Sequence, residues 1–195
     1  MGEETIVFID GAYLSLIAKH FFGKKPPAFD ISKLAEKLAR DQGLECKGIF
    51  YYTAPPYQGR QTNAEETRRK ANYDKFIARL KKLPQLIVRE GRCQKLDNSF
   101  AQKGVDTLLT IDLARLPLKF NVAKIVLVLC DTDFVPILNE LRAESGIKVI
   151  IYYYSDRVRG SRFSMSNHIL TACDKSVMLD KSCFESSFFQ QENKK

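Results

Sequence analysis

Two unbroken runs of apolar, largely β-branched and aromatic residues constrain this chain most. They are K-I-V-L-V-L-C at residues 124–130 and I-K-V-I-I-Y-Y-Y at residues 147–154. A strand with apolar side chains on both faces must be covered on both faces, and such strands are typical of parallel sheets in α/β proteins. The segment between them, residues 136–143, has helical spacing. We therefore predict an α/β fold in which helices cover both sides of a mainly parallel sheet.

The rest of the chain continues this alternation of strands and helices. Further strands are expected at residues 5–9, 48–53, 86–88 and 177–179, and helical apolar stripes at 14–21, 31–38, 73–80, 105–116 and 168–173. Thr62 and Glu65 form a T-x-x-E capping box that is expected to begin the third of these helices, and Pro117 is expected to end the fourth. We expect one domain over residues 1–181 and a polar C-terminal tail over residues 182–195.

Composition narrows the classes of function. The 195 residues include 31 Lys or Arg against 23 Asp or Glu, a net charge of +8, and a basic chain most often meets a polyanion such as nucleic acid. The five cysteines lie far apart without C-x-x-C spacing, which fits a reducing, cytoplasmic setting better than disulfides or a zinc site. No apolar run approaches the roughly 18 residues of a membrane span, so no membrane partner is expected.

Four aspartates occupy positions that a parallel sheet brings together. Asp10 follows the first expected strand, Asp131 and Asp133 follow the run at residues 124–130, and Asp106 begins the helix before that run. The carboxyl ends of the strands of such a sheet line one crevice. Carboxylates gathered there need a proton or a cation, and Mg²⁺ and Mn²⁺ prefer oxygen ligands. Each acid taken alone also fits the role of a helix cap.

Three motifs around these acids resemble a known family. F-I-D-G-A-Y-L at residues 8–14, Q-K-G-V-D-T-L-L at 102–109 and C-D-T-D-F-V-P-I-L at 130–138 are similar to the acidic motifs of NYN-domain proteins, the LabA-like branch of the PIN-like nuclease superfamily. The resemblance covers about residues 5–179. It implies a PIN-like three-layer α/β/α sandwich and an Mg²⁺/Mn²⁺-dependent endoribonuclease. The catalytic and metal-binding residues that it implies are Asp10, Asp106, Asp131 and Asp133.

The chain departs from the family pattern at three points. Tyr13 stands where the family often has Asn, Leu129-Cys130 replaces Ser-Gly, and Thr132 replaces Ser but keeps the hydroxyl. The loss of the Asn leaves a second hypothesis open, an RNA-binding or adaptor module of the same fold with weak or no catalysis. A phosphatase of the haloacid-dehalogenase type fits worse, because no second acid lies two residues after Asp10.

Further residues are expected to support the acids or to hold RNA. Asp112 falls on the buried stripe of its helix and needs a partner, so we expect it either to support the four acids or to bond loop backbone; Thr132 is also expected to support them. Residues 60–82 are strongly basic, and arginines near a helix N-terminus suit phosphate. The RNA-binding candidates are Arg68, Arg69, Lys70, Arg157, Arg159 and Arg162. Both basic segments could equally be solvated surface. The oligomeric state is left open, a homodimer included.

Overall fold

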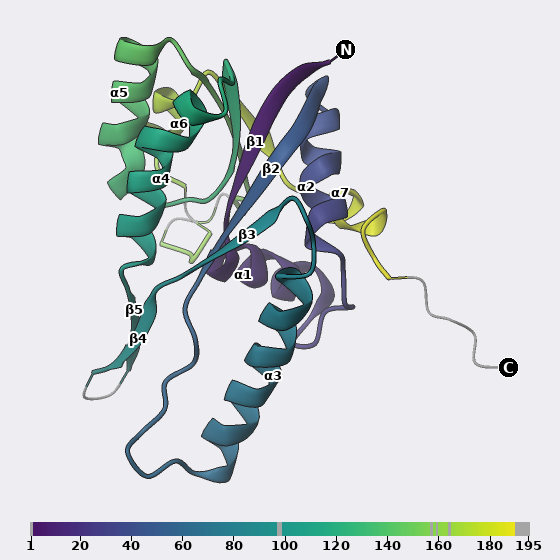
Figure 1. Ribbon diagram of the computed structural model, residues 1–195, viewed down its shortest axis with the longest axis vertical. Helices are drawn as coiled ribbons and strands as arrows, with labels where there is room; N and C mark the ends of the chain where they lie inside the picture. The colour runs from purple at the N-terminus through teal and green to yellow at the C-terminus, as the bar shows by residue number, and fades with distance from the viewer. Residues whose placement is uncertain (1, 97–98, 157, 159, 164, 190–195) are drawn as a thin grey trace, which may run out of the picture.

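A six-stranded parallel sheet forms the centre of the computed structural model, which describes residues 2–96, 99–156, 158, 160–163 and 165–189 (Figure 1). Each strand pairs in parallel with its neighbour. In spatial order the strands are β3 (Leu86–Glu90), β2 (Leu44–Thr53), β1 (Glu3–Asp10), β6 (Lys124–Val128), β7 (Lys148–Tyr153) and β8 (Lys175–Met178).

Helices cover both faces of this sheet (Figure 1). On one face lie α1 (Gly11–Phe22), α2 (Ile31–Arg40), α3 (Ala64–Leu80) and α7 (Lys181–Glu185). On the other lie α4 (Val105–Lys119), α5 (Val135–Ser145) and α6 (Asn167–Ala172), with the short 3-10 helix η1 (Thr132–Phe134) before α5. The predicted α/β fold class is confirmed: three layers surround a mainly parallel sheet.

The central strand β1 shows why its sequence is apolar without interruption. Side chains alternate across a strand, so Ile6 and Phe8 face α4 and α5 while Val7 and Ile9 face α1 and α2. All four side chains are completely buried. Because both faces carry a core, neither set of alternate positions can be polar, and the sheet must lie between two layers of helices.

Two of the expected helix boundaries are wrong. The capping box does not begin α3: Asn63 is the cap, and its side-chain oxygen accepts a 2.8 Å hydrogen bond from the Glu66 amide. Asn is favoured over Thr as a helix cap, so the helix begins after Asn63, one residue later than the capping box predicts. Pro117 does not end α4, which continues to Lys119. A proline in the last turn removes a single hydrogen bond, and Pro117 is buried there.

A two-stranded antiparallel hairpin, β4 (Arg92–Lys95) and β5 (Phe100–Lys103), extends from the lower end of the sheet and was not predicted (Figure 1). Its sequences, R-C-Q-K and F-A-Q-K, are short and mostly polar, so they carry no alternating pattern that distinguishes them from a loop. The hairpin lies between β3 and α4 in the chain, directly before the helix that carries Asp106.

Part of the segment expected to be a polar tail is folded against the domain. Helix α7 buries Phe184 completely, and Phe188 forms a β-bridge with Phe29. The expected boundary between domain and tail at residue 181 stays a prediction. Within the described residues, no helix is long and apolar enough to cross a membrane, and all five cysteines are free thiols.

The buried position of Phe8 predicts a large loss of stability on truncation. Phe8 has no exposed surface and its ring stacks on that of Phe50, with centroids 5.6 Å apart. Phe8→Ala should lower the free energy of unfolding by about 3–5 kcal/mol, because it removes buried surface and leaves a cavity. Leu118→Ala, at a side chain that is 61% exposed, should change it by no more than about 0.5 kcal/mol. Urea denaturation of both variants measures the difference, and equal losses would contradict this account of the core.

Candidate active site

The parallel pairing of β1 with β6 brings two acids to one edge of the sheet. Ile9 pairs with Val128, so the two strands end side by side. Asp10 is the last residue of β1, and Asp131 follows β6 and caps η1. Both side chains therefore lie at the carboxyl edge, where the loops of an open parallel sheet form a crevice.

The carboxylate of Asp10 caps α1 and is also the most enclosed of the candidate acids. One of its oxygens accepts hydrogen bonds from the amides of Ala12, at 2.9 Å, and Tyr13, at 3.2 Å. Burial raises the pKa of Asp10; these two bonds oppose the shift, and the negative charges of Asp106 and Asp131 add to it. The helix-cap role and a role in a charged site therefore coexist in one side chain.

Asp106 has no capping role. Helix α4 begins after Gly104, whose φ of 79° lies in the left-handed region, and no side chain caps it. Asp106 lies in the first turn and is largely exposed. Partial shielding of its carboxyl group from water raises its pKa, and the negative charges of Asp131 and Asp133 raise it further. Asp131 and Asp133 are exposed as well, and an oxygen of Asp131 accepts a 2.9 Å hydrogen bond from the Asp133 amide.

Like-charge repulsion thus links all four aspartates. Asp10 is repelled by Asp106 and Asp131, and Asp106 is repelled by Asp131 and Asp133. None of the four forms an ion pair with any residue that the structure describes. The four carboxylates form an acidic cluster without a cationic partner in the described part of the chain.

The donor set of this acidic cluster suits a hard divalent cation, since it offers only carboxylate oxygens. Over the described ranges, however, no three His, Cys, Asp or Glu side chains lie close enough together to hold an ion. Mg²⁺ is usually bound by one or two carboxylates, with waters and substrate phosphate oxygens completing its shell. The chemistry of the residues therefore fits such an ion, with the remaining ligands left to water and substrate.

Asp112 is bonded by two side chains. Its carboxylate accepts two hydrogen bonds from Arg89, at 2.7 and 3.1 Å, and one from the Tyr52 hydroxyl at 2.9 Å. It is only 7% exposed, so this ion pair satisfies a charge that burial would otherwise penalise. The expected bonding to loop backbone is not observed among the described residues.

Sequence reasoning missed Arg89. In the sheet Asp10 pairs with Tyr52, and Tyr52 pairs with Arg89, so the three occupy one row at the carboxyl edge. Only the register of three strands reveals this row, because Arg89 lies far from both partners in sequence. The other expected supporting residue, Thr132, is exposed, and its hydroxyl makes no hydrogen bond to a described residue.

Tyr13, which stands where the family often has Asn, makes a structural contact with the backbone of Tyr154. It is 4% exposed, and its hydroxyl accepts a 2.8 Å hydrogen bond from the Tyr154 amide and donates to the Tyr154 carbonyl at 3.3 Å. Burial raises its pKa well above the ordinary value of a tyrosine. The side chain thus fastens α1 to the end of β7, and its hydroxyl is already engaged.

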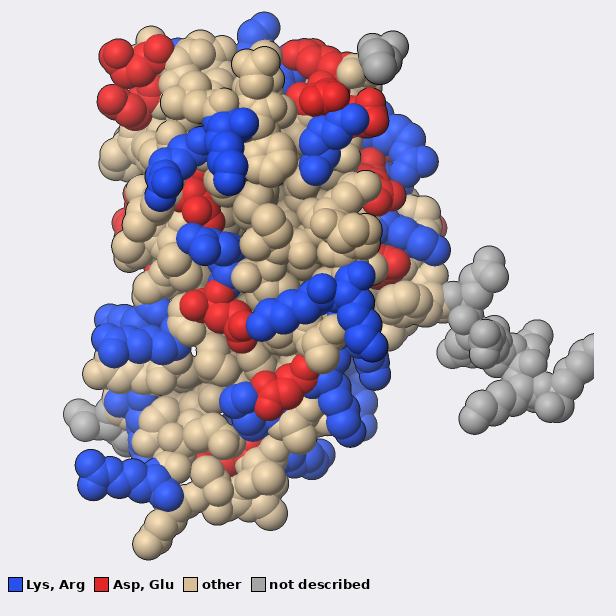
Figure 2. All heavy atoms as spheres, in the orientation of Figure 1, with Lys and Arg blue, Asp and Glu red and all other residues tan. Residues whose placement is uncertain are grey.

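The basic candidates lie apart from these acids along the chain. On α3, Arg69 pairs with Glu65 and Lys70 with Asp74, while Arg68 is exposed and makes no ion pair with a described residue. Figure 2 shows Lys and Arg side chains over the lower half of the view, where Figure 1 places α3 and the β4–β5 hairpin, and over its upper half as well. Arg162 is exposed. Arg157 and Arg159 lie outside the described residues.

The model of one family, the NYN domain, matches residues 4–180. The chain belongs to the NYN domain family. This NYN domain places it in the PIN-like nuclease superfamily, whose members are generally nucleases and usually use divalent metals.

One solved structure supports the fold of this NYN domain. A protein of unknown function from Vibrio parahaemolyticus is similar with a TM-score of 0.59 and 16% identity, covering 96% of this chain and 98% of that one. At such identity the similarity shows the fold alone. A type II dehydroquinase from Butyrivibrio crossotus has a TM-score of only 0.36 and 13% identity, with 90% and 88% coverage, which is too low to show a shared fold. No protein of curated function matches.

The raised pKa of Asp10 predicts a pH-dependent gain of stability for Asp10→Asn. A carboxyl group with a higher pKa in the folded state holds its proton more tightly there, so stability falls as pH rises from about 4 through the raised value. Asn keeps the oxygen that caps α1 but carries no charge. Its melting temperature relative to wild type should therefore increase between pH 4 and pH 7.

Asp30→Asn is the matched control for this experiment. Asp30 caps α2 by the same pattern, accepting from the amides of Ser32 and Lys33, but it lies outside the acidic cluster. Thermal unfolding of both variants across this pH range checks the prediction. If the melting temperature of the Asp10→Asn protein changed with pH in parallel with that of wild type, the result would contradict charge repulsion at Asp10. A large loss of melting temperature at every pH would leave helix capping as the only role of Asp10.

Proposed function

We propose that this NYN domain is an Mg²⁺- or Mn²⁺-dependent endoribonuclease of the LabA-like branch that acts on RNA in the cytoplasm. The observation that supports the proposal is the acidic cluster: Asp10 and Asp131 follow neighbouring strands, charge repulsion links them to Asp106 and Asp133, and none of the four has an ion pair in the described residues. Such a cluster costs stability, and a divalent cation removes that cost. The free state of all five cysteines supports a reducing compartment.

The four aspartates differ in how firmly they are held. Asp10 is fixed by the first turn of α1, and Asp131 by the amide of Asp133, so each has one oxygen engaged and one available. Asp106 and Asp133 are exposed and can turn toward a shared ligand. Together these residues would hold the ion, which when bound supplies Lewis-acid stabilisation of a phosphate and an activated water. Because Asp106, Asp131 and Asp133 are exposed, an RNA backbone could reach them from solvent.

The alternative function is a binding or adaptor module of the same fold with a weak or inactive site. Two observations favour it: the hydroxyl of Tyr13 is bound to β7, and no preformed three-ligand group exists among the described residues. This alternative keeps RNA as the partner and removes only the chemistry. A homodimer stays a prediction under both functions.

A nuclease assay separates the two functions. The protein should cut single-stranded or structured RNA with Mg²⁺ or Mn²⁺ and not in EDTA, and Asp10→Asn or Asp131→Asn should lower the rate by roughly 100-fold or more. Asp30→Asn, which changes a cap of the same kind elsewhere, should cut like wild type. Full activity in the Asp10 variant would exclude the acidic cluster as the metal site. Metal-independent RNA binding without cleavage would favour the adaptor.

We also propose that Arg68, Arg69 and Lys70 hold the RNA backbone, with Arg157, Arg159 and Arg162 as a second basic set. The ion pairs of Arg69 and Lys70 do not oppose this role, because exposed pairs on a helix contribute only about 0.3–0.5 kcal/mol. A phosphate can replace a carboxylate partner at little cost.

The salt dependence of RNA affinity tests the α3 set. Replacing Arg68, Arg69 and Lys70 together with Ala should reduce the slope of log affinity against log salt by roughly 2 units, because about 0.7 counterions are released per phosphate contact on a single strand. The control replaces Lys124, Lys148 and Lys175, which begin β6, β7 and β8 at the opposite edge of the sheet. If both triple variants had the same slope of log affinity against log salt, the basic residues of α3 would be solvated surface charges without a role in RNA binding.

A further inference from the structure

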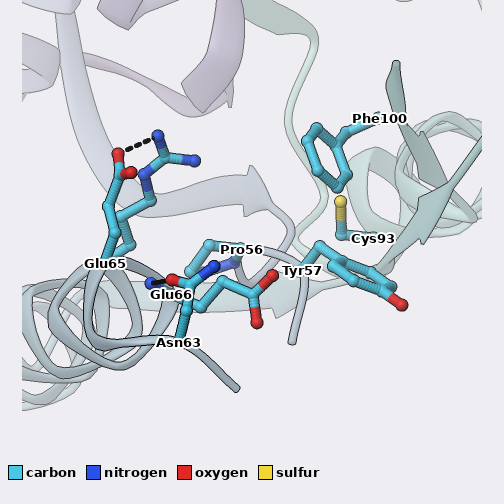
Figure 3. A pocket seen from close by; sticks show the side chains of 8 residues that line it. Pro56, Tyr57, Asn63, Glu65, Glu66, Cys93 and Phe100 are labelled. Carbon is cyan, nitrogen blue, oxygen red and sulfur yellow. Dashed lines mark hydrogen bonds and ion pairs between the residues drawn. The ribbon is translucent and has the colours of Figure 1, made fainter. Parts of the chain in front are cut away.

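A pocket of about 350 Å³ lies between the β4–β5 hairpin and the start of α3. We name it the hairpin pocket; its lining residues are Pro56, Tyr57, Asn63, Glu65, Glu66, Arg69, Cys93 and Phe100. Figure 3 shows its two sides. Tyr57, Cys93 and Phe100 lie together as one wall, and the side chains at the start of α3, Asn63, Glu65 and Glu66, lie opposite. The volume is in the range of small-ligand sites.

The first wall presents an aromatic ring to solvent. Phe100 is 55% exposed, and its ring centroid lies 5.4 Å from that of Tyr57 with 37° between the planes. A third ring cannot enter between them, because two contacts of about 3.5 Å each would be needed. Tyr57 therefore supports the Phe100 ring in a tilted contact, and more than half of the Phe100 surface remains accessible to a ligand. Exposed aromatic faces of this kind serve as platforms for unpaired bases.

The opposite wall is polar and held in shape by its own contacts. Glu65 is paired with Arg69, and Glu66 accepts a 3.1 Å hydrogen bond from the Gly59 amide. Gln58 donates to the Glu66 carbonyl at 2.9 Å, which ties the loop after β2 to the first turn of α3. In the free protein both carboxylates are thus engaged, Glu65 by an ion pair and Glu66 by a backbone amide. The site is formed before any ligand arrives, which lowers the entropy cost of binding.

The hairpin is bonded to the end of β2 and is followed in the chain by the helix that carries Asp106. The Gly91 amide donates to the Thr53 carbonyl at the end of β2, at 2.9 Å. A Cβ on Gly91 would lie 2.6 Å from the Lys103 carbonyl oxygen, so only glycine permits this close approach of the two hairpin ends. Strand β5 then leads through Gly104 and Val105 to Asp106. From Phe100 to Gly104 the chain spans roughly 14 Å, at about 3.4 Å per residue.

A cation stands next to the aromatic ring. Lys95 pairs with Phe100 across the hairpin, and paired residues point to the same face of a two-stranded ribbon. Lys95 is exposed and makes no ion pair with a described residue. An exposed ring with a free ammonium beside it is the combination that single-stranded nucleic acid requires, one group for the base and one for the phosphate.

We infer that the hairpin pocket is a subsite for an unpaired nucleobase, stacked on Phe100, of a single-stranded RNA whose backbone continues toward the acidic cluster. The inference rests on the proposed function for the nature of the polymer. It names the substrate class of the site: single-stranded RNA, or a single-stranded stretch of a folded one, since a base within a duplex cannot offer its face to the ring. Phe100 contacts the base, and Lys95 contacts a neighbouring phosphate.

Binding is measured with the Asp10→Asn variant of the 195-residue chain in EDTA, so that cleavage does not interfere, using a fluorescently labelled single-stranded RNA of about ten nucleotides. Adding Phe100→Ala should weaken binding roughly 5- to 100-fold, the effect of losing one base stack. The salt slope should stay unchanged, because no charge is lost. Lys95→Ala should instead lower the slope by about 0.7. Phe189→Ala, at an equally exposed phenylalanine lining a different cavity, should bind like the parent protein.

Phe100→Trp gives a second, direct measurement. The chain contains no tryptophan, so the new indole is the only one, and it can still stack. Its fluorescence should be quenched by single-stranded RNA, and neither by the same strand with abasic sites nor by a blunt RNA duplex. Quenching by the abasic strand would overturn the inference, and so would equal affinities of the Phe100→Ala and Phe189→Ala proteins or the absence of any binding to single strands.

The outcomes also separate this subsite from the proposed nuclease function. Loss of cleavage in Asp10→Asn with unchanged binding in Phe100→Ala would overturn the subsite and leave the nuclease intact. Weakened binding in Phe100→Ala, together with no cleavage of any RNA by the wild-type protein, would keep the subsite and exclude the nuclease. Single-stranded DNA serves as the last comparison: equal affinity would show that the pocket recognises the base and not the ribose.

Discussion

The parallel pairing of β1 with β6 is the constraint on which the rest of the site depends. Both strands are buried on both faces, so their register is fixed by the two cores and their ends cannot move apart. Each is followed by an aspartate that begins a helical turn, Asp10 for α1 and Asp131 for η1. The carboxylates of Asp10 and Asp131 therefore cap helical turns and also repel each other. The electrostatic cost falls mainly on Asp10, because Asp106, Asp131 and Asp133 are exposed to water.

Two polar links hold the elements that carry the acids. The Tyr13 hydroxyl fastens α1 to the end of β7, and Asp112 fastens α4 to β2 and β3 through Tyr52 and Arg89. Both links lie within or against apolar cores, where a hydrogen bond left unmade is expensive. Helix α1, which follows Asp10, and helix α4, which carries Asp106, are consequently fixed by hydrogen bonds as well as by packing. In this chain the replacement of the family's Asn by Tyr13 exchanges one amide near the acidic cluster for such a link.

The sequence predicts the fold and the position of the acids because both follow from local patterns. Continuous apolar runs specify buried parallel strands, and an aspartate directly after such a run must lie at the carboxyl edge. The features that were missed depend on long-range contacts. The β4–β5 hairpin is too polar to show a period, and the partnership of Arg89 with Asp112 requires the register of three strands. The cap at Asn63 was missed because Thr62, one residue earlier, offered an equally plausible capping box.

The distribution of charge explains why a basic chain surrounds an acidic cluster. Four carboxylates repel a polyphosphate, so they cannot supply affinity for RNA by themselves. Under the proposed function, affinity for RNA would come from positive charge and from stacking beside the cluster, on α3 and on the β4–β5 hairpin, which both extend from the lower end of the sheet (Figure 1). A divalent cation would neutralise the cluster only where a phosphate also contributes ligands, since the described carboxylates form no complete set. Under the proposed function, ion and RNA would therefore strengthen each other's binding at the cluster, while α3 and the hairpin would hold RNA in the absence of the ion as well.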